Sequence, residues 1–351
     1  MLHVGLIGYG YAGQTFHAPL IRATPGLALV AVASSDATKV HAKLGHAMAV
    51  VTPQELIARD DIDLVVIAVP NDLHCPLALS AMKAGRHVVV DKPFALDVAQ
   101  AASLAAAAAR SDRVLSVFHN RRWDGDFLTL QAVLRDRRVG RPVEFVSHFD
   151  RYQPQVRARW REGRQPGSGL WMDLGPHLVD QALQLFGTPS AIALDLASMR
   201  DGALTDDWFA AQLHWAHGPY AGLRARLQAS MLAARPGARF TLHGTEASFS
   251  VDGLDPQEDV LKTVIDPALI ADPAWGRDER QATLWRSDGN TATCTLLPLA
   301  HGAYPAYYAA LRDALLGAGP CPVTAIDALA VQSVLDAGQR SARERREITL
   351  D

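Results

Sequence analysis

The sequence predicts an α/β protein with a doubly wound parallel sheet over residues 1–120 and an α+β part with an open, mainly antiparallel sheet over residues 121–351. Three observations predict this class. Short β-branched runs alternate with helical segments as far as residue 120, and a glycine motif at residues 8–13 joins the first run to the first helix. Beyond residue 190, strands follow one another between glycine and proline turns with little helix.

The N-terminal part alternates strands and helices in a fixed order. Residues 3–8 predict a strand, and residues 12–23 have helical spacing, although Pro19 is expected to kink that helix. Residues 63–69 are a near-continuous β-branched run, which is typical of a parallel strand buried on both faces. The remaining elements are strands at 27–33, 87–91 and 114–118 and helices at 75–85 and 98–110.

The rhythm changes after residue 120, where we place the boundary between two domains. Residues 126–138 predict a helix, and residues 142–150 predict an alternating strand. Because proline is tolerated in the first turn of a helix, a further helix is expected to begin near Pro176. Two helices at 304–316 and 325–340 close the chain.

Composition excludes several classes of partner. A net charge of -3 gives no electrostatic reason to expect nucleic acid or an anionic membrane. The basic cluster at residues 160–164 is short and interrupted by glutamate, so we interpret it as a solvated face. Cys75, Cys294 and Cys321 lie far apart without metal-ligand spacing, so neither a disulfide framework nor a metal site is indicated.

From the N-terminal residues we expect no targeting signal. They lack the charged and apolar regions of a signal peptide, and the sequence contains no run of about 18 uncharged apolar residues. We therefore expect a cytoplasmic protein without a membrane partner.

The glycine motif Gly8-Tyr9-Gly10-Tyr11-Ala12-Gly13 predicts a dinucleotide-binding loop. Glycine lets the backbone approach a pyrophosphate, which then lies at the N-terminus of the following helix, where the amide dipoles favour negative charge. The motif alone is weak, but its place between a strand and a helix strengthens the prediction. The alternative is a tight structural turn.

Ser34 and Ser35 occupy the position, about 20 residues beyond the loop, where an acidic residue would bind the ribose 2′-hydroxyl of NAD. Hydroxyls together with Lys39 favour a 2′-phosphate, so we predict NADP as cofactor, with NAD as the alternative. Asp36 weakens this inference. An ordinary solvated loop is the competing interpretation.

Two turns that follow predicted strands carry further candidates. Pro70, Asn71 and His74 lie where doubly wound sheets bind ligands, although Pro-Asn-Asp is also ordinary turn chemistry. Lys92 follows the strand at 87–91, where an ammonium group can stabilise alkoxide character on a substrate oxygen. A lysine at such a place is otherwise simply solvent-facing.

Asp173 and His177 lie one helical turn apart and can face the same cleft. Histidine can accept a hydroxyl proton at neutral pH, and aspartate can orient it or the substrate. Alone, this pair is more often helix capping with a structural histidine. Its conjunction with Lys92 favours catalysis.

Four motifs in one order resemble the Gfo/Idh/MocA oxidoreductases. They are the glycine motif, Ala-Gly-Arg-His-Val-Val-Val-Asp-Lys-Pro at 84–93, Asn-Arg-Arg-Trp-Asp at 120–124 and Asp-Leu-Gly-Pro-His at 173–177. The segments 16–19, 116–123 and 304–308 further resemble the subgroup that includes NADP-dependent scyllo-inositol dehydrogenases. The resemblance covers essentially the whole chain and implies NAD(P)-dependent dehydrogenation of sugars or inositols.

The resemblance also implies roles for individual residues. Lys92 matches the lysine of the family's Glu-Lys-Pro motif, with Asp91 in place of the usual glutamate, so a contact made by that carboxylate is in doubt. His177 would be the general acid/base, with Asp173 as its neighbour. The second domain of the family commonly packs against another subunit, which implies a homodimer or homotetramer.

The predicted activity is hydride transfer between a secondary alcohol of an inositol or sugar and nicotinamide. A reductase of a keto-sugar or keto-polyol and a non-catalytic NADP-binding sensor remain alternatives. Asp91, Lys92 and Asn120 complete the predicted cofactor site. Besides Asp173 and His177, the candidates for substrate contact, any of which can instead be structural, are Arg122, Asp150, Tyr152, Trp160 and Tyr304.

Overall fold

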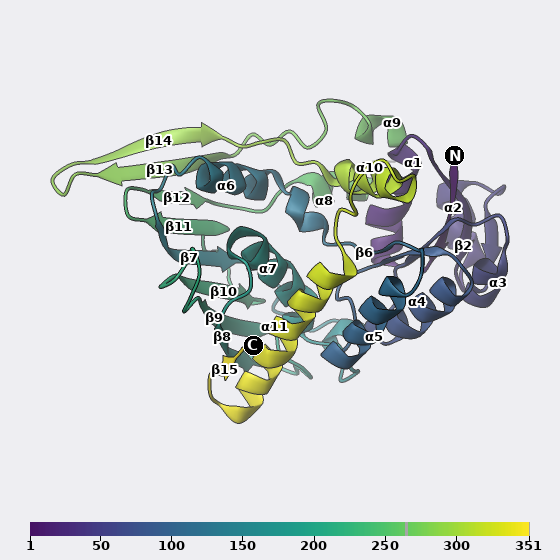
Figure 1. Ribbon diagram of the computed structural model, residues 1–351, viewed down its shortest axis with the longest axis horizontal. Helices are drawn as coiled ribbons and strands as arrows, with labels where there is room; N and C mark the ends of the chain where they lie inside the picture. Colours follow the sequence, from purple (N-terminus) through teal and green to yellow (C-terminus); the bar gives the residue numbers. More distant parts are fainter. Residues whose placement is uncertain (264–265, 351) are drawn as a thin grey trace. The chain divides into compact units, whose positions relative to one another are not determined.

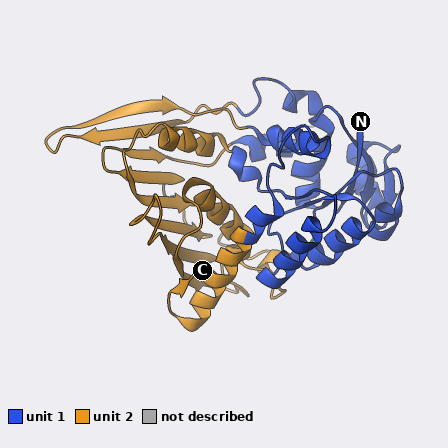
Figure 2. Cartoon of the chain, in the orientation of Figure 1, with its two compact units in different colours: residues 1–123, 256–276, 303–329 blue, residues 124–255, 277–302, 330–351 orange. Residues whose placement is uncertain are grey.

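The computed structural model describes residues 1–263 and 266–350, which form two compact units (Figures 1 and 2). Unit 1 comprises residues 1–123, 256–276 and 303–329, and unit 2 comprises residues 124–255, 277–302 and 330–351. A single boundary at residue 120 does not anticipate the two later segments in unit 1. Local periodicity carries no information about which distant segments pack together.

Unit 1 contains a parallel six-stranded sheet in the order β3-β2-β1-β4-β5-β6. The order reverses between β1 and β4, which makes the sheet doubly wound and confirms the predicted Rossmann class. Its strands are near-continuous apolar runs because both faces are covered. Their bounds are β1 Leu2–Ile7, β2 Leu27–Ala33, β3 Ala49–Val51, β4 Leu64–Ile67, β5 His87–Val90 and β6 Leu115–Val117.

Helices cover both faces of this sheet, because the crossovers on the two sides of β1 run in opposite directions. Helices α3, α4 and α5 pack together, and α1 packs with α9 and α10, which come from later in the chain (Figure 1). The helices of unit 1 are α1 Ala18–Ala23, α2 Ala37–Leu44, α3 Pro53–Ala58, α4 His74–Lys83, α5 Val98–Ala109, α8 Gln257–Thr263, α9 Pro267–Ile270 and α10 Tyr304–Leu315.

The first helix contains the irregularity expected at Pro19. A π-helical stretch, η1 (Gly13–His17), precedes α1, and the amide of Ala18 donates to the carbonyl of Gly13 five residues earlier. Proline lacks an amide hydrogen and crowds the carbonyl four residues before it. The widened turn accommodates Pro19, as π-bulges do in other helices.

Unit 2 contains a nine-stranded sheet in the order β14-β13-β12-β11-β7-β10-β9-β8-β15. Among its described pairs only β7 and β10 are parallel, so the prediction of a mainly antiparallel sheet is confirmed. The strands are β7 Pro142–His148, β8 Ala191–Ala197, β9 Trp208–His214, β10 Arg224–Ser230, β11 Phe240–Gly244, β12 Ser248–Val251, β13 Gln281–Ser287, β14 Ala292–Pro298 and β15 Ile348–Thr349.

One face of this sheet carries α6 (Gly125–Arg135), α7 (Leu170–Phe186) and the second half of α11 (Ala325–Glu344) (Figure 1). The opposite face exposes polar side chains, among them Asp195, Gln212 and Arg226. No helix among the described residues is long and apolar enough to span a membrane.

Helix α7 begins at Leu170, six residues before Pro176, so the expected start was wrong. The amide of Leu170 donates to the carbonyl oxygen of Asp206, and the amide of Trp171 donates to the Asp206 carboxylate at 2.7 Å. A distant residue therefore caps this helix, and nothing in the local sequence indicates it. Pro176 lies inside the helix.

Candidate functional site

The glycine loop of unit 1 is shaped by two close backbone approaches. A Cβ atom at Gly13 would lie 2.2 Å from the carbonyl oxygen of Gly8, and one at Gly8 would lie 2.2 Å from that of Ala68. Gly8 also has φ of 99°, which other residues rarely adopt. A side chain at either position would therefore strain the loop.

Gly10 differs from these two, because a Cβ there would meet nothing within 4 Å. Its backbone faces solvent, and the helical turn that starts at Tyr11 presents amide groups beside it. Ala12, half-buried, continues this turn. An exposed glycine at a helix N-terminus fits the close approach of a pyrophosphate, so the loop suits a dinucleotide.

The segment after β2 is held by its own hydrogen bonds. The Asp36 carboxylate caps α2 by accepting from the amide of Lys39 at 2.9 Å, and the Asp36 amide donates to Ser34 Oγ at 3.1 Å. Ser35 and the Lys39 side chain are exposed. The carboxylate of Asp36 thus serves α2, while hydroxyls and an ammonium group remain accessible at the end of β2.

His74 connects two of the turns that carry candidates. Its Nδ1 lies 2.8 Å from the carbonyl oxygen of Pro93 and its Nε2 lies 3.0 Å from that of Val69, and the residue is 1% exposed. The ring therefore fixes the cis Lys92–Pro93 turn against the end of β4. Pro70 is exposed and Asn71 is buried in the same turn.

A buried histidine stands beside Asp91. His17 is fully buried; its Nδ1 lies 2.6 Å from Tyr308 Oη and its Nε2 lies 3.9 Å from Asp91 Oδ1. Burial lowers the pKa of His17 to about 4, although Asp91 acts in the opposite direction. The imidazole is thus neutral, and Asp91 accepts a hydrogen bond from the Lys92 amide at 2.8 Å.

The structure places three further candidates of unit 1 around η3 (Asn120–Trp123), after β6. Asn120 is buried at that strand end. Arg122 lies 3.6 Å from the Asp327 carboxylate and donates to the carbonyl of Pro322, so its guanidinium is engaged within the unit. Tyr304 is fully buried at the start of α10.

In unit 2, α7 carries Asp173 and His177 one turn apart. His177 is 6% exposed and stacks on Phe149 with ring centroids 6.4 Å apart. Asp173 forms an ion pair with Arg161, whose Nε lies 3.3 Å from Oδ1. Asp173 is therefore held by a partner that the sequence did not indicate.

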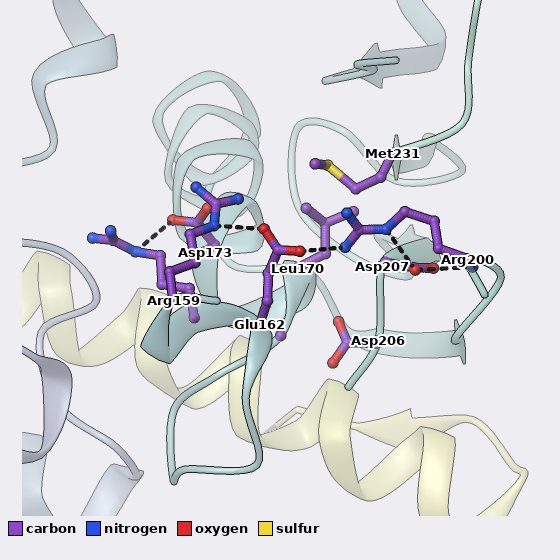
Figure 3. Close-up of a pocket in the computed structure, with 10 residues that line it drawn as sticks. Arg159, Glu162, Leu170, Asp173, Arg200, Asp206, Asp207 and Met231 are labelled. Atoms are coloured by element: carbon purple, nitrogen blue, oxygen red, sulfur yellow. Dashed lines mark hydrogen bonds and ion pairs between the residues drawn. The ribbon is translucent and has the colours of Figure 1, made fainter. Parts of the chain in front are cut away.

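Arg161 belongs to the cluster at residues 160–164, and the interpretation of that cluster as a solvated face was wrong for Glu162. Glu162 is 7% exposed and lies between Arg159 and Arg200, which also pairs with Asp207 (Figure 3). Burial raises the pKa of Glu162, but hydrogen bonds from Arg157 and Arg159 and the nearby Arg200 outweigh it, so the pKa is lowered. Glu162 thus belongs to a buried ion network, while Trp160 and Arg161 are half-buried and Arg164 is exposed.

This network borders a cavity of about 20 Å³ next to Asp173, which is room for about one water molecule and too small for a sugar. Arg200 also donates to the carbonyls of Gln153 and Gln155, both at 3.2 Å. The network therefore fixes the segment that carries Arg161 rather than forming a binding pocket.

The remaining candidates of unit 2 lie on the segment after β7. Asp150 accepts from the amide of Gly237 at 3.1 Å, Tyr152 is 60% exposed, and Trp160 is half-buried with the Arg161 guanidinium 4.7 Å from its ring centroid. No group of three or more His, Cys, Asp or Glu side chains within residues 1–263 and 266–350 is arranged to hold a metal ion.

Two family models cover most of the chain. Residues 2–119 match a model described as "Oxidoreductase family, NAD-binding Rossmann fold", and residues 132–350 match one described as "Oxidoreductase family, C-terminal alpha/beta domain".

Curated relatives match over their full length. The chain is 49% identical to the uncharacterized oxidoreductase YdgJ of Escherichia coli, with 99% of each chain covered. It is 32% identical to scyllo-inositol 2-dehydrogenase (NADP(+)) IolW of Bacillus subtilis, with 100% of this chain and 96% of the relative covered. The solved structure of YPO2259 from Yersinia pestis superimposes with a TM-score of 0.92 at 47% identity, covering 100% of this chain and 97% of that one.

Proposed function

The chain belongs to the Gfo/Idh/MocA family of NAD(P)-dependent oxidoreductases, and from this premise we propose that it transfers hydride between a secondary alcohol of an inositol or sugar and NADP. The observation that carries the proposal is that each unit holds its own group of candidate site residues. One follows the strand ends of a nucleotide-binding fold, and the other places a carboxylate and a histidine on α7. The similarity to IolW, a scyllo-inositol 2-dehydrogenase (NADP(+)), supports the inositol class.

The chain's own residues supply the acid–base chemistry. His177 takes the hydroxyl proton during alcohol oxidation, because imidazole has a suitable proton affinity at neutral pH. The Lys92 ammonium donates a hydrogen bond to a substrate oxygen and stabilises its developing negative charge. Asp173, neutralised by Arg161, accepts hydrogen bonds from the histidine or a neighbouring substrate hydroxyl. The nicotinamide, when bound, carries the hydride.

NADP is proposed over NAD on the segment after β2. The carboxylate that follows the serines, that of Asp36, accepts from the amide of Lys39 as a helix cap. Ser34, Ser35 and the Lys39 ammonium are then the groups available to a 2′-phosphate, which a free carboxylate would repel.

The experiment that tests the proposal measures initial rates of NADP reduction across inositol isomers and aldoses, with NAD in parallel. Fast turnover of one isomer with NADP supports the dehydrogenase, and a large preference for NAD in kcat/KM overturns the choice of cofactor. Tight NADPH binding without turnover of any alcohol or keto-sugar indicates a sensor instead.

We also propose that the open face of the nine-stranded sheet joins two copies of the chain. This face carries side chains of both signs, including Arg226 and Glu144, which form an ion pair at 2.8 Å. A groove of about 490 Å³ crosses β8, β9 and β10 on unit 2. A two-fold interface can place such a mixed surface against itself. A monomeric mass by light scattering would contradict this assignment.

A further inference from the structure

Helix α8 belongs to unit 1, although it follows six strands of the unit 2 sheet, β7 to β12, in the chain. Its Gln257 is fully buried. The side-chain amide donates to the carbonyl of Trp123 at 3.0 Å, and its oxygen accepts from the Tyr304 amide at 2.8 Å and from Trp275 at 2.9 Å. These contacts anchor the start of α8 firmly in unit 1.

The next residue, Glu258, joins two turns that follow different strands. Its Oε1 accepts from Tyr11 Oη at 2.6 Å, and its Oε2 accepts from Arg121 Nη2 at 2.6 Å. Tyr11 lies in the glycine loop after β1, and Arg121 lies in η3 after β6. Because all six strands are parallel, both turns lie at the carboxyl edge of the sheet, where doubly wound sheets bind ligands.

The electrostatics suit a place beside an anionic ligand. A lone carboxylate near a pyrophosphate loop would repel the phosphates, but Glu258 is compensated by the buried Arg121 guanidinium and by Lys262, whose ammonium lies 3.8 Å away. The Tyr11 ring also has an edge contact with Phe16, at a centroid distance of 6.0 Å. Tyr11 is thus held at both its ring and its hydroxyl, while half of it stays exposed.

We propose that Glu258 is a positioning residue that retains the dinucleotide by fastening Tyr11 across the rim of the glycine loop. Release of the ligand requires the rim to open, which breaks the hydrogen bond between Tyr11 and Glu258. Bonds of this charge-assisted kind are stronger than neutral ones. The inference rests on the proposed binding of NADP(H) by unit 1.

The test measures the dissociation rate of NADPH from the full-length protein, by following NADPH fluorescence after mixing with excess NADP. Tyr11→Phe removes only the hydroxyl, and Glu258→Ala removes its acceptor. Each is expected to raise the dissociation rate by about tenfold. Because both remove the same bond, the double variant should release NADPH no faster than Glu258→Ala alone.

Asp259→Asn provides the matched control. Asp259 is the adjacent residue of α8, is largely exposed and pairs with Lys262 at 2.6 Å. This variant should release NADPH at the wild-type rate. If Glu258 had a purely structural role, Glu258→Ala would lower the melting temperature but would not show this pattern of dissociation rates. Tyr11→Phe should have the melting temperature of wild type.

The outcomes separate the two proposals. Wild-type release rates in both Tyr11→Phe and Glu258→Ala, or additive effects in the double variant, overturn the role of Glu258 and leave the proposed function standing. If the protein binds NADH but not NADPH, the dissociation rates are measured with NADH instead. That result overturns only the choice of cofactor. A wild-type protein that binds neither dinucleotide overturns both proposals.

Discussion

The glycine loop and the His74 turn of unit 1 are held by backbone geometry, whereas Asp173 of unit 2 is held by a charged partner. In unit 1, Gly8 and Gly13 allow close backbone approaches, His74 touches two carbonyls, and the buried His17 is neutral. In unit 2, Asp173 is paired with Arg161, and the neighbouring Arg200 is buried among carboxylates.

This difference assigns separate tasks to the two regions. Backbone amides and small residues bind a phosphate without side-chain charge, which suits a cofactor shared by many enzymes. Paired side chains orient a particular hydroxyl pattern, because a polar group left without its partner is costly. Four measurements test whether backbone contacts and paired charges hold the two regions in these different ways.

The largest effect is expected from His177→Asn. Loss of the acid–base group should lower kcat by about a thousandfold, while the Kd for NADPH stays within about twofold of wild type. Steady-state rates and a fluorescence titration check the two halves of this statement. His301→Asn, an exposed histidine of unit 2, should behave like wild type. Turnover near wild type in His177→Asn would sink the proposed mechanism.

Arg200→Met tests whether the ion network holds unit 2 together. Removing one partner from a buried charge network leaves Glu162 and Asp207 uncompensated and should lower the free energy of unfolding by about 3 kcal/mol. Urea unfolding followed by tryptophan fluorescence measures this. The control is Arg159→Met, which removes a more exposed partner of Glu162 and should cost about 1 kcal/mol or less. Equal costs would show that burial does not set the contribution.

Two glycine substitutions test whether close backbone contacts shape the glycine loop of unit 1. Gly13→Ala places a methyl group 2.2 Å from the Gly8 carbonyl oxygen and should lower the free energy of unfolding by about 2 kcal/mol. Gly10→Ala meets nothing in the protein, so it should keep its stability and lose affinity for NADPH. Denaturation and binding assays on both variants separate folding from ligand approach. An unimpaired Kd in Gly10→Ala would contradict the assignment of the phosphate site.

The smallest effect concerns pH. The pKa of His17 is lowered to about 4 in the folded protein, so the unfolded chain binds the proton more readily and stability falls as pH drops from about 6.5 towards 4. Between pH 7 and pH 5.5 the loss should be about 1 kcal/mol. His17→Gln should lack this part of the pH dependence. The lowered pKa of Glu162 affects stability only at lower pH, so it does not contribute in this range. Identical pH profiles of stability for wild type and His17→Gln would contradict the role given to His17 in unit 1.

The same contrast explains what the sequence could predict. The buried strands of unit 1 are local runs of β-branched residues, and Gly8, Gly10 and Gly13 form a local motif. Both could therefore be predicted from the sequence alone. The start of α7 was not, because Asp206 supplies its cap from far along the chain. Glu162 was taken for a surface residue because its partner Arg200 is likewise distant.

Site residues followed the same pattern. Lys92, Asp173 and His177 were proposed from motif order, and their roles stay predictions. Glu258 and Arg161 escaped notice because single charged residues in unremarkable sequence carry no signal until their partners are known. Of the predicted substrate contacts, Arg122 is paired with Asp327 and Tyr304 is buried inside unit 1, because of partners far along the chain that local spacing does not reveal.

The interleaving of the two units has a consequence for synthesis on the ribosome. The first 123 residues emerge with all six strands of the parallel sheet, but the fully buried Tyr304, Tyr307 and Tyr308 of α10 arrive only after most of unit 2 has been translated. Apolar surface on the nascent sheet therefore stays uncovered over that interval, which is when chains of this size are prone to aggregate. Neither unit has its full sequence until the other has been almost completely translated.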